Sequence, residues 1–551
     1  MQHVTGLVRS GTTTEILLTA SEAYPAFERN VLGSQSEIWA SFRIFDPSTR
    51  LRTPEARKVG ETWFDLIADA LRRGVSIHLA LADFDPVARP SLHRGTWMSL
   101  RKLWAAAEAA GPRAAPLRAV AALHPAVTGF LPRAVCWPQA ASCVSRTARW
   151  LNSLEPSVRR AALRDMPGLA DFLRVAEDGT VRPRRWGMPR LHPATHHQKL
   201  AVFDRQRLYI GGLDLDERRW DTPEHDRPGE ETWQDLQLLI EGPAAAEAQT
   251  HLETFLEVTA GRAEPPPQKR LLRTMSRPRP WALGGFGPEP VVHEILDAHE
   301  MLASKARRLI YLESQFFRDT RLARRLARAG RENPDLGLIL ILPAAPEEVA
   351  FGTVWGIDTR YGEFLQARCL RILDEAFGPR LFIGGAAQPR RRPHRRSGRA
   401  EQSGPEGKNG PEEFSSEDPP AAPAEGAGRG LLKGAPIVYI HAKVSIFDDA
   451  AIVSSANLNG RSMTWDTEAG VYLTNPQDVR RLRERVMLHW LPPDPDPRYL
   501  DPEQAVAMWR LLALRNARLP PDRREGFILP YDLDAAERLG QSMPGVPEAM
   551  V

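Results

Sequence analysis

The sequence predicts an α/β fold made of two similar lobes. The order helix, strand, helix, strand occurs once in each half of the 551-residue chain, which indicates an internal duplication. The expected strands are near-continuous apolar runs, such as LGLILILPAA at 336–345. Runs of this kind are typical of strands buried on both faces. We therefore expect two pseudo-symmetric α/β domains, each a mixed sheet covered by helices.

The elements follow the same order in both halves. In the first half, helical patterns at 21–33 and 61–74 precede strands at 36–46 and 75–85. In the second half, helical patterns at 292–306 and 321–334 precede strands at 308–317 and 336–345. We expect the first domain to span 1–265, the second 285–495, and a C-terminal tail, 496–551, to pack on the core.

Each half is interrupted before its next strand. The first interruption, 86–190, holds five tryptophans, for which we expect core packing, with a lid or a membrane-facing edge as the alternative: Trp97, Trp104, Trp137, Trp150 and Trp186. The second interruption contains 388–430, which is rich in Pro, Gly, Ser and charge, and we expect a disordered loop insertion there. A solvated loop is the simpler interpretation, and a reversible contact of its arginines with anionic lipid headgroups is the alternative.

Composition narrows the function. No apolar run reaches the roughly 18 residues that a membrane span needs, and the N-terminus lacks the pattern of a secretory signal. Three cysteines provide no disulfide framework and favour a reducing compartment. The formal net charge of +4 is too small to predict a nucleic-acid partner. We expect a cytoplasmic protein, with export by a route that needs no signal left open.

A short motif occurs twice, once after each interruption. The stretches HHQKLAVFD and HAKVSIFDD both fit HxKxxxxD, although the chain has only eight lysines. Two copies at equivalent points of a repeat are not accidental. The six motif residues, which we take together as the candidate catalytic set, are His197, Lys199, Asp204, His441, Lys443 and Asp448.

Strand geometry sorts these residues. Residues i and i+2 of a strand point to the same face, so each histidine should emerge beside its lysine. Asp204 and Asp448 have the opposite parity, and we expect them to fix the loop after the strand rather than to touch a substrate. His196, next to His197, should also point away and be structural.

Two imidazoles and two ammonium groups suit a phosphodiester. The lysines can neutralise its anionic oxygens, one neutral imidazole can attack phosphorus, and a protonated imidazole can supply the proton of the leaving oxygen. No dense cluster of carboxylates or histidines indicates a metal site. We expect neither a metal nor a cofactor.

Small residues follow each motif, where a turn could approach the phosphate closely. The first turn carries Gly211 and Gly212, and the second carries Ser454 and Ser455. Asp214 and Asn457, two or three residues further on, are candidate substrate-binding residues, since an amide can donate to a phosphate oxygen.

Two carboxylates precede the next strand of each half, Asp235 in ETWQDLQLLIEG and Glu468 in DTEAGVYL. A carboxylate bonded to one imidazole nitrogen would fix the tautomer and support charge on the ring. We assign this orienting role to both residues, and the alternative that they are surface carboxylates stays open.

The motifs together resemble the phospholipase D superfamily, and phospholipase D itself most of all. The resemblance rests on the duplicated HxKxxxxD and on the stretches GGLDL, RRWDTPEH, TWQDLQLLIEGP, IYLESQFF and SSANLNGRS. It implies one active site between two α/β domains, His197 as nucleophile and His441 as general acid. It also implies that Glu313 and Gln315 line the cleft. Two departures are Asp214, where many members have Asn, and Ser454, which replaces the usual Gly.

The resemblance implies hydrolysis of a phospholipid headgroup phosphodiester to phosphatidic acid through a phosphohistidine, with possible transphosphatidylation. A phosphatidyltransferase like cardiolipin synthase is the first alternative, and a nuclease or another phosphodiesterase is the second. A lipid-binding module without catalysis is a different class, against which both complete His/Lys pairs argue. We expect a phospholipid membrane surface as partner, peripheral association with it, no nucleic acid, and a monomer.

Overall fold

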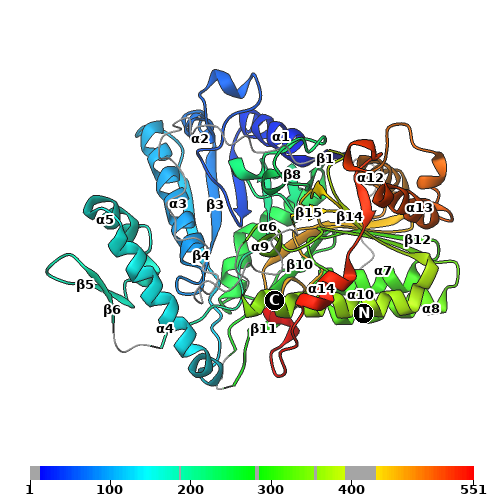
Figure 1. Cartoon of the computed structure of the whole chain (residues 1–551). Coiled ribbons are helices and arrows are strands. Elements are labelled where there is room, and N and C mark those ends of the chain that lie inside the picture. Colours follow the sequence, from blue (N-terminus) through cyan, green and yellow to red (C-terminus); the bar gives the residue numbers. More distant parts are fainter. Residues whose placement is uncertain (1–12, 185–187, 280–283, 353–355, 391–429) are drawn as a thin grey trace.

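A computed structural model describes residues 13–184, 188–279, 284–352, 356–390 and 430–551 of the chain. It contains two large mixed sheets with helices packed on them (Figure 1). The expected α/β class, with one helix-covered sheet in each half, is confirmed. Nearly all of the expected loop insertion, 391–429, and Trp186 lie outside the described residues.

The first sheet has seven strands, and the three at one end, β2, β3 and β4, run parallel while the others pair antiparallel. In spatial order they are β1 (Thr13–Leu18), β9 (Leu236–Glu241), β8 (Arg207–Gly211), β7 (Leu200–Phe203), β2 (Glu37–Phe42), β3 (Ser76–Asp83) and β4 (Leu117–Leu123). One face packs in an apolar core with α1 (Thr19–Gly33), α2 (Trp63–Arg72) and α3 (Pro90–Ala110).

The second sheet repeats this plan and adds strands at both edges. Its nine strands are β11 (Glu289–His293), β10 (Leu271–Arg277), β19 (Glu468–Leu473), β18 (Ala450–Ser454), β17 (Val444–Phe447), β12 (Leu309–Glu313), β13 (Gly337–Leu342), β14 (Leu381–Ala386) and β20 (Ile528–Pro530). Here β12, β13 and β14 are the parallel strands. The covering helices are α7 (Glu294–Lys305), α8 (Thr320–Glu332) and α10 (Ile357–Phe377).

All eight helices and strands expected from the repeat are present, but the strands end sooner than their apolar runs. The strand expected at 36–46 ends at Phe42, because the next backbone groups leave the ladder. The N–H of Ile44, for example, donates to a carboxylate oxygen of Asp214 at 3.0 Å. The apolar sequence therefore extends beyond the end of the strand into the loop that follows it.

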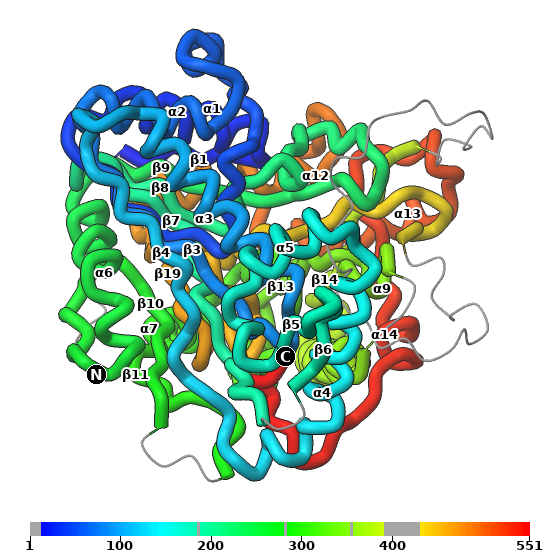
Figure 2. Tube along the Cα trace, turned by 90° about the vertical axis from the view of Figure 1, so that its left-hand side faces the viewer, coloured from blue at the N-terminus to red at the C-terminus, as the bar shows by residue number. Residues whose placement is uncertain are grey.

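The two halves share one large apolar core. Helices α6 (Pro243–Thr259) and α12 (Pro476–Trp490) follow equivalent strands of the two sheets and contribute to it. Each of them also packs on the other half: α6 contacts β10, and α12 contacts β1. Figure 2 shows α6 beside β10. The halves are thus joined by exchanged helix contacts as well as by apolar packing.

The C-terminal segment is more than a tail on the core. Helix α13 (Ala505–Arg518) buries Trp509 completely in the shared core, and β20 pairs with the edge strand β14. The sheet also takes β10 from before residue 285. The second sheet therefore draws on residues beyond both ends of the expected 285–495 range.

The expected interruption at 86–190 is not continuous, because it contains α3 and the sheet strand β4; only its later part, from α4 on, forms a small projecting unit (Figure 1). It contains α4 (Phe130–Ser153), α5 (Pro156–Arg164), β5 (Leu173–Val175) and β6 (Val181–Pro183) around a core of its own. The expectation of core packing is wrong for Trp104 and Trp137, whose residues are 42% and 41% exposed. Trp97 and Trp150 are half-buried.

Shorter elements complete the described chain: α9 (Glu347–Phe351), α11 (Gly460–Thr464), α14 (Leu533–Leu539), and the hairpin of β15 (Leu431–Leu432) with β16 (Ala435–Pro436). Within the described ranges, no helix is both long enough and apolar enough to cross a lipid bilayer.

Replacing Trp509 with alanine tests whether α13 belongs to the core. We expect the free energy of unfolding to fall by about 3–5 kcal/mol, since a fully buried aromatic side chain is lost. Leu511→Ala on the same helix is the matched control, because Leu511 is 62% exposed. Chemical denaturation monitored by circular dichroism measures both, and equal effects of the two variants would contradict the packing described.

Candidate active site

Both His/Lys pairs lie just before a strand rather than within it. His197 and Lys199 precede β7, and His441 and Lys443 precede β17. The Nζ of Lys199 lies 3.4 Å from the Nε2 of His197 and donates to the carbonyl oxygen of the same histidine at 2.7 Å. The Nζ of Lys443 likewise donates to the carbonyl oxygen of His441. The i, i+2 spacing thus keeps each lysine beside its histidine, as predicted.

Each motif segment is held by backbone hydrogen bonds to the other half. The N–H of His197 donates to the carbonyl oxygen of Thr467 at 2.8 Å, and the N–H of Thr467 donates to Thr195 at 2.9 Å. The second motif repeats the arrangement: the N–H of His441 donates to Gln234 at 2.7 Å. These short parallel bridges lie immediately before β19 and β9, and they fix the two motif segments across the boundary between the halves.

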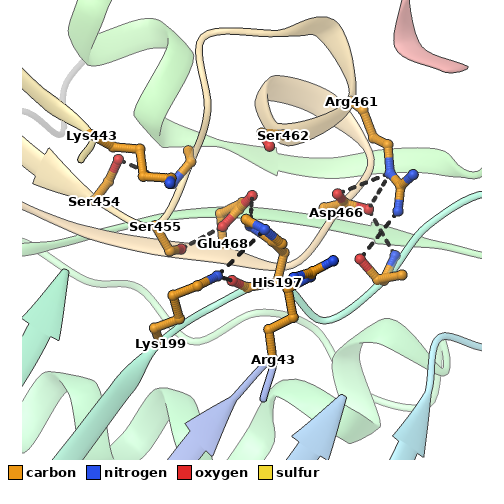
Figure 3. Close-up of polar contacts among 12 residues, drawn as sticks. Arg43, His197, Lys199, Lys443, Ser454, Ser455, Arg461, Ser462, Asp466 and Glu468 are labelled. Atoms are coloured by element: carbon orange, nitrogen blue, oxygen red, sulfur yellow. Dashed lines mark hydrogen bonds and ion pairs between the residues drawn. The ribbon is translucent and has the colours of Figure 1, made fainter. Parts of the chain in front are cut away.

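The two predicted orienting carboxylates contact the histidines crosswise. Glu468 of the second half lies 2.8 Å from Nδ1 of His197, and Asp235 of the first half lies 2.6 Å from Nδ1 of His441. Figure 3 shows the ring of His197 between Glu468 and Lys199. Both carboxylates are fully buried, so the alternative of surface carboxylates is wrong. A proton on Nδ1 shared with a carboxylate leaves Nε2 for chemistry.

Burial dominates the electrostatics of the imidazoles. Desolvation lowers the pKa of His197 well below its usual value, and the charges of Lys199 and Arg43 add to the effect. The pKa of His441 is also lowered well below its usual value by burial, and then by Lys443. A neutral imidazole with a free Nε2 is the form in which histidine acts as a nucleophile.

The charged neighbours are shifted as well. Burial raises the pKa of Asp235 to about 6, against the attraction of Lys443. Burial lowers the pKa of Lys443 to about 7, against the attraction of Asp235. The pKa of Glu468 is raised by burial, and that of Lys199 is lowered by it. A bound anion would favour the charged form of both lysines.

The turns after the motifs need small residues for different reasons. A Cβ on Gly212 would lie 2.3 Å from Oδ1 of Asp235 and 3.1 Å from Cδ of Lys443, so the backbone approaches both closely. In the second half, the hydroxyl of Ser455 donates to the carboxylate of Glu468. Ser455 therefore supports the carboxylate that orients His197.

The two candidate substrate-binding residues differ. Asp214 is fully buried, and its carboxylate lies 3.9 Å from Nζ of Lys199 and 3.8 Å from the guanidinium of Arg43. An anionic group in that place repels a phosphate, so Asp214 serves to hold the cations and its expected substrate contact is not supported. Asn457 is also buried, and its side-chain oxygen has no hydrogen-bond partner.

Asp204 and Asp448 lie outside the site. Asp204 accepts hydrogen bonds from the N–H groups of Ser36 at 2.8 Å and Glu37 at 3.1 Å, where β2 begins. Asp448 does the same for Leu309 at 2.9 Å, at the start of β12. Their place in the candidate catalytic set is therefore a correction: each aspartate fastens its loop to the neighbouring strand, as the strand parity indicates.

The resemblance placed Glu313 and Gln315 in the cleft, and the structure assigns them other contacts. Glu313 is buried and accepts hydrogen bonds from the hydroxyl of Tyr311 at 2.7 Å and from the indole of Trp490. Burial raises its pKa to about 7. It is therefore held among core residues, while its second carboxylate oxygen is buried without a hydrogen-bond partner, and its cleft role stays a prediction. Gln315 is half-buried and donates to the hydroxyl of Tyr439 at 2.9 Å.

Sequence reasoning missed two arginines and a tryptophan. Arg43 approaches from the end of β2 beside Asp214 and points toward the His197 site in Figure 3. Trp233 lies 4.7 Å from His441 between ring centroids, and the guanidinium of Arg219 lies 3.6 Å from the Trp233 ring. The chain contains so many arginines that neither Arg43 nor Arg219 stands out in the sequence. Arg219 lies in RRW and Trp233 in ETWQD, two stretches that carry the resemblance, but no residue spacing connects either of them with His441.

Among the described residues, no group of three or more His, Cys, Asp and Glu side chains is placed to hold a metal ion. The charged side chains that the structure places at the site are those of the two lysines, Arg43, Arg219 and the buried carboxylates.

Comparison with known proteins gives one curated relative and broad structural likenesses. No family model matches the chain. Phospholipase D beta 2 of Arabidopsis thaliana is 22% identical over 400 residues, which cover 53% of this chain and 41% of the relative. The match therefore spans about two fifths of the length of that relative.

Two solved structures to which the chain is similar show weak likenesses. The phosphatidylserine synthase of Haemophilus influenzae Rd KW20 has a TM-score of 0.45 and 10% identity, covering 86% of this chain and 84% of that one. The polyphosphate kinase of Porphyromonas gingivalis has a TM-score of 0.38 and 11% identity, covering 86% and 50%. Neither likeness bears on the chemistry of the site.

Glu468→Gln should lower phosphodiester turnover by about 10²- to 10⁴-fold while the chain stays folded. The amide cannot stabilise a charge on the His197 ring and allows the wrong tautomer. Glu257→Gln is the matched control, because Glu257 forms a surface ion pair with Arg262. Steady-state rates and thermal unfolding of both variants measure the effect, and near-normal turnover by Glu468→Gln would contradict the orienting role.

Turnover should depend on pH through the pair formed by Asp235 and Lys443. We expect it to fall as the pH drops through about 6, where the Asp235 carboxylate is protonated and no longer supports His441. We expect it to fall again above about 7, where Lys443 loses its proton. The profile of kcat/KM on a soluble substrate measures both limbs. Lys443→Arg should be slower but lack the alkaline limb, and an unchanged limb would rule out Lys443 as its source.

Proposed function

We propose that this chain, which belongs to the phospholipase D superfamily, hydrolyses the headgroup phosphodiester of a glycerophospholipid to phosphatidic acid. The observation that carries the proposal is the crossed arrangement of two imidazoles, each fixed by a buried carboxylate of the other half and each beside a lysine. Similarity to a phospholipase D supports a phospholipid as the substrate.

The first step forms a covalent intermediate. The lone pair on Nε2 of His197 attacks phosphorus, so that a P–N bond forms and the P–O bond to the headgroup breaks. His441 donates a proton to the departing oxygen. The ammonium groups of Lys199 and Lys443 offset the charge on the phosphoryl oxygens, and the amide of Asn457 can donate to one of them.

His441 must be protonated for this step, although burial and Lys443 lower its pKa in the free chain. An anionic substrate favours the charged form, and Asp235 stabilises it through Nδ1. Binding of the phosphodiester therefore prepares the acid. His197 stays neutral because its low pKa disfavours a proton.

The second step returns both histidines to their starting state. His441, now neutral, takes a proton from water, and the resulting hydroxide attacks phosphorus while the P–N bond breaks. Phosphatidic acid leaves, and the bonding pair returns to His197. An alcohol in the place of water would give a phosphatidyl-alcohol, so hydrolase and phosphatidyltransferase reactions share the intermediate.

Adding a small primary alcohol should divert product from phosphatidic acid to phosphatidyl-alcohol. Total headgroup release should change less than the product ratio, because the alcohol competes only for the second step. Mass spectrometry of the lipid products and a headgroup assay over a panel of phospholipids measure both quantities. Phosphatidic acid alone at high alcohol would contradict a shared intermediate.

His197→Ala and His441→Ala should each remove nearly all turnover, because nucleophile and acid act together. Asp204→Asn is the matched control within the same motif, since Asp204 contacts backbone amides and not the site. Robust cleavage of DNA without phospholipid turnover would reject the proposal in favour of a nuclease.

A further inference from the structure

The first half of α4 exposes large apolar side chains to solvent. Phe130 is 51% exposed, Leu131 55%, Val135 81% and Trp137 41%. We call these four residues the α4 tip. They gather within just over two helical turns, whereas exposed apolar residues on a soluble surface are usually scattered singly.

The second half of the helix packs in an apolar core, whereas the first half is held at fewer points, by the buried Pro132 and Ala140. Val144, Ala148 and Leu151 are buried in the small core of the projecting unit, together with Leu169. The tip lies before these positions and has no comparable apolar cover among the described residues. In Figure 1 the helix lies with α5, β5 and β6 at the edge of the molecule, and in Figure 2, which looks onto that side, the same elements lie in front. The fold therefore leaves the apolar side chains of the tip exposed to solvent.

The charge of the helix complements an anionic surface. α4 contains three arginines and no acidic residue. At 100° per residue, Arg146 and Arg149 lie on the same side as Leu131 and Val135. At 1.5 Å per residue, Arg146 lies about 16 Å beyond Val135 along the axis. One side of the helix thus carries Leu131 and Val135 at the tip and two arginines farther back, whereas Phe130 and Trp137 lie on the side that is buried farther along the helix.

We propose that the α4 tip docks on an anionic phospholipid bilayer, with Leu131 and Val135 in the boundary between headgroups and acyl chains and Arg146 and Arg149, on the same side of the helix, near the phosphates. The arginines gain from the negative surface potential of anionic lipids. The choice of a bilayer over a protein partner rests on the proposed function.

The start of α4 is tied to the segment that carries the first motif. The N–H of Thr128 donates to the carbonyl oxygen of Leu191 at 2.8 Å. The imidazole Nδ1 of His192 lies 2.8 Å from the carbonyl oxygen of His124. His192 is five residues before His197 in the chain. A docked tip would therefore bring the first-motif segment to the surface that supplies the lipid.

Vesicle binding tests the proposal without turnover. All chains carry His197→Ala so that the lipids stay intact, and co-sedimentation is measured with vesicles of phosphatidylcholine, with and without phosphatidylglycerol. Leu131→Gln with Val135→Asp should weaken binding to anionic vesicles by at least about tenfold, since two apolar side chains no longer enter the bilayer. Leu511→Asp on α13 is the matched control, with 62% exposure of the original side chain, and should bind normally.

A fluorescent probe gives an independent measurement. Cys136 is exposed next to Trp137 and can carry an environment-sensitive label, once Cys143→Ala has removed the half-buried thiol. The emission should shift to the blue on anionic vesicles. An emission that stays aqueous on vesicles, with normal binding by the double variant, would overturn the proposal. So would a blue shift that depends on protein concentration without lipid, because the tip would then be a contact between copies.

The outcomes separate docking from catalysis. If the double variant loses vesicle binding but the native chain turns over no phospholipid, the docking surface stands and the proposed function fails. If the same two substitutions, made in a chain that keeps His197, leave the cleavage of vesicle phospholipid at the native rate, the function stands and the docking surface fails. Equal loss of binding in Leu511→Asp would also reject the tip as the docking surface.

Discussion

The arrangement of the molecule depends on one reciprocal contact: each histidine shares its Nδ1 with a carboxylate supplied by the opposite half. Glu468 stands at the start of β19 and Asp235 immediately before β9, where short backbone bridges hold them against Thr195–His197 and Tyr439–His441. The same crossing recurs in the packing, where α6 contacts β10 and α12 contacts β1. A site built in this way requires the two sheets to keep a fixed position relative to each other. The shared apolar core supplies that rigidity, because close-packed interiors resist displacement.

Much of the fold could be predicted from the sequence because its signals are local. Period and composition located α1, α2, α7 and α8 and the strands that follow them. The edges were less visible. β20 is a three-residue strand in a segment expected to be a tail, and β10 lies before the expected start of the second domain. Short strands carry little periodicity, and their place is decided by which edge of the sheet is open, which is a long-range property.

The site was predictable where residue spacing maps directly onto geometry. The HxK pairs and their orienting carboxylates are brought together, and the parity argument assigned Asp204 and Asp448 to the loops after their strands, where they bind backbone N–H groups. Spacing said nothing of Arg43 or Trp233, which reach the site through tertiary packing. Glu313 was assigned by resemblance alone, and its actual partners, Tyr311 and Trp490, are core residues. Motif similarity locates a segment but does not decide which way its side chains point.

The crossed carboxylates also bear on how the chain acquires its active state during synthesis. His197 and Glu468 are 271 residues apart, and His441 and Asp235 are 206 apart. Contacts of such high sequence separation form late, after the loop entropy between them has been overcome. In a nascent chain that has emerged only as far as α6, β1 is not yet contacted by helix α12. The apolar residues of the first half that belong to the shared core stay exposed until the second half is made. A two-lobed protein is most prone to aggregation while this surface is exposed. The late contacts also mean that an unfinished chain has no carboxylate to orient the nucleophile His197.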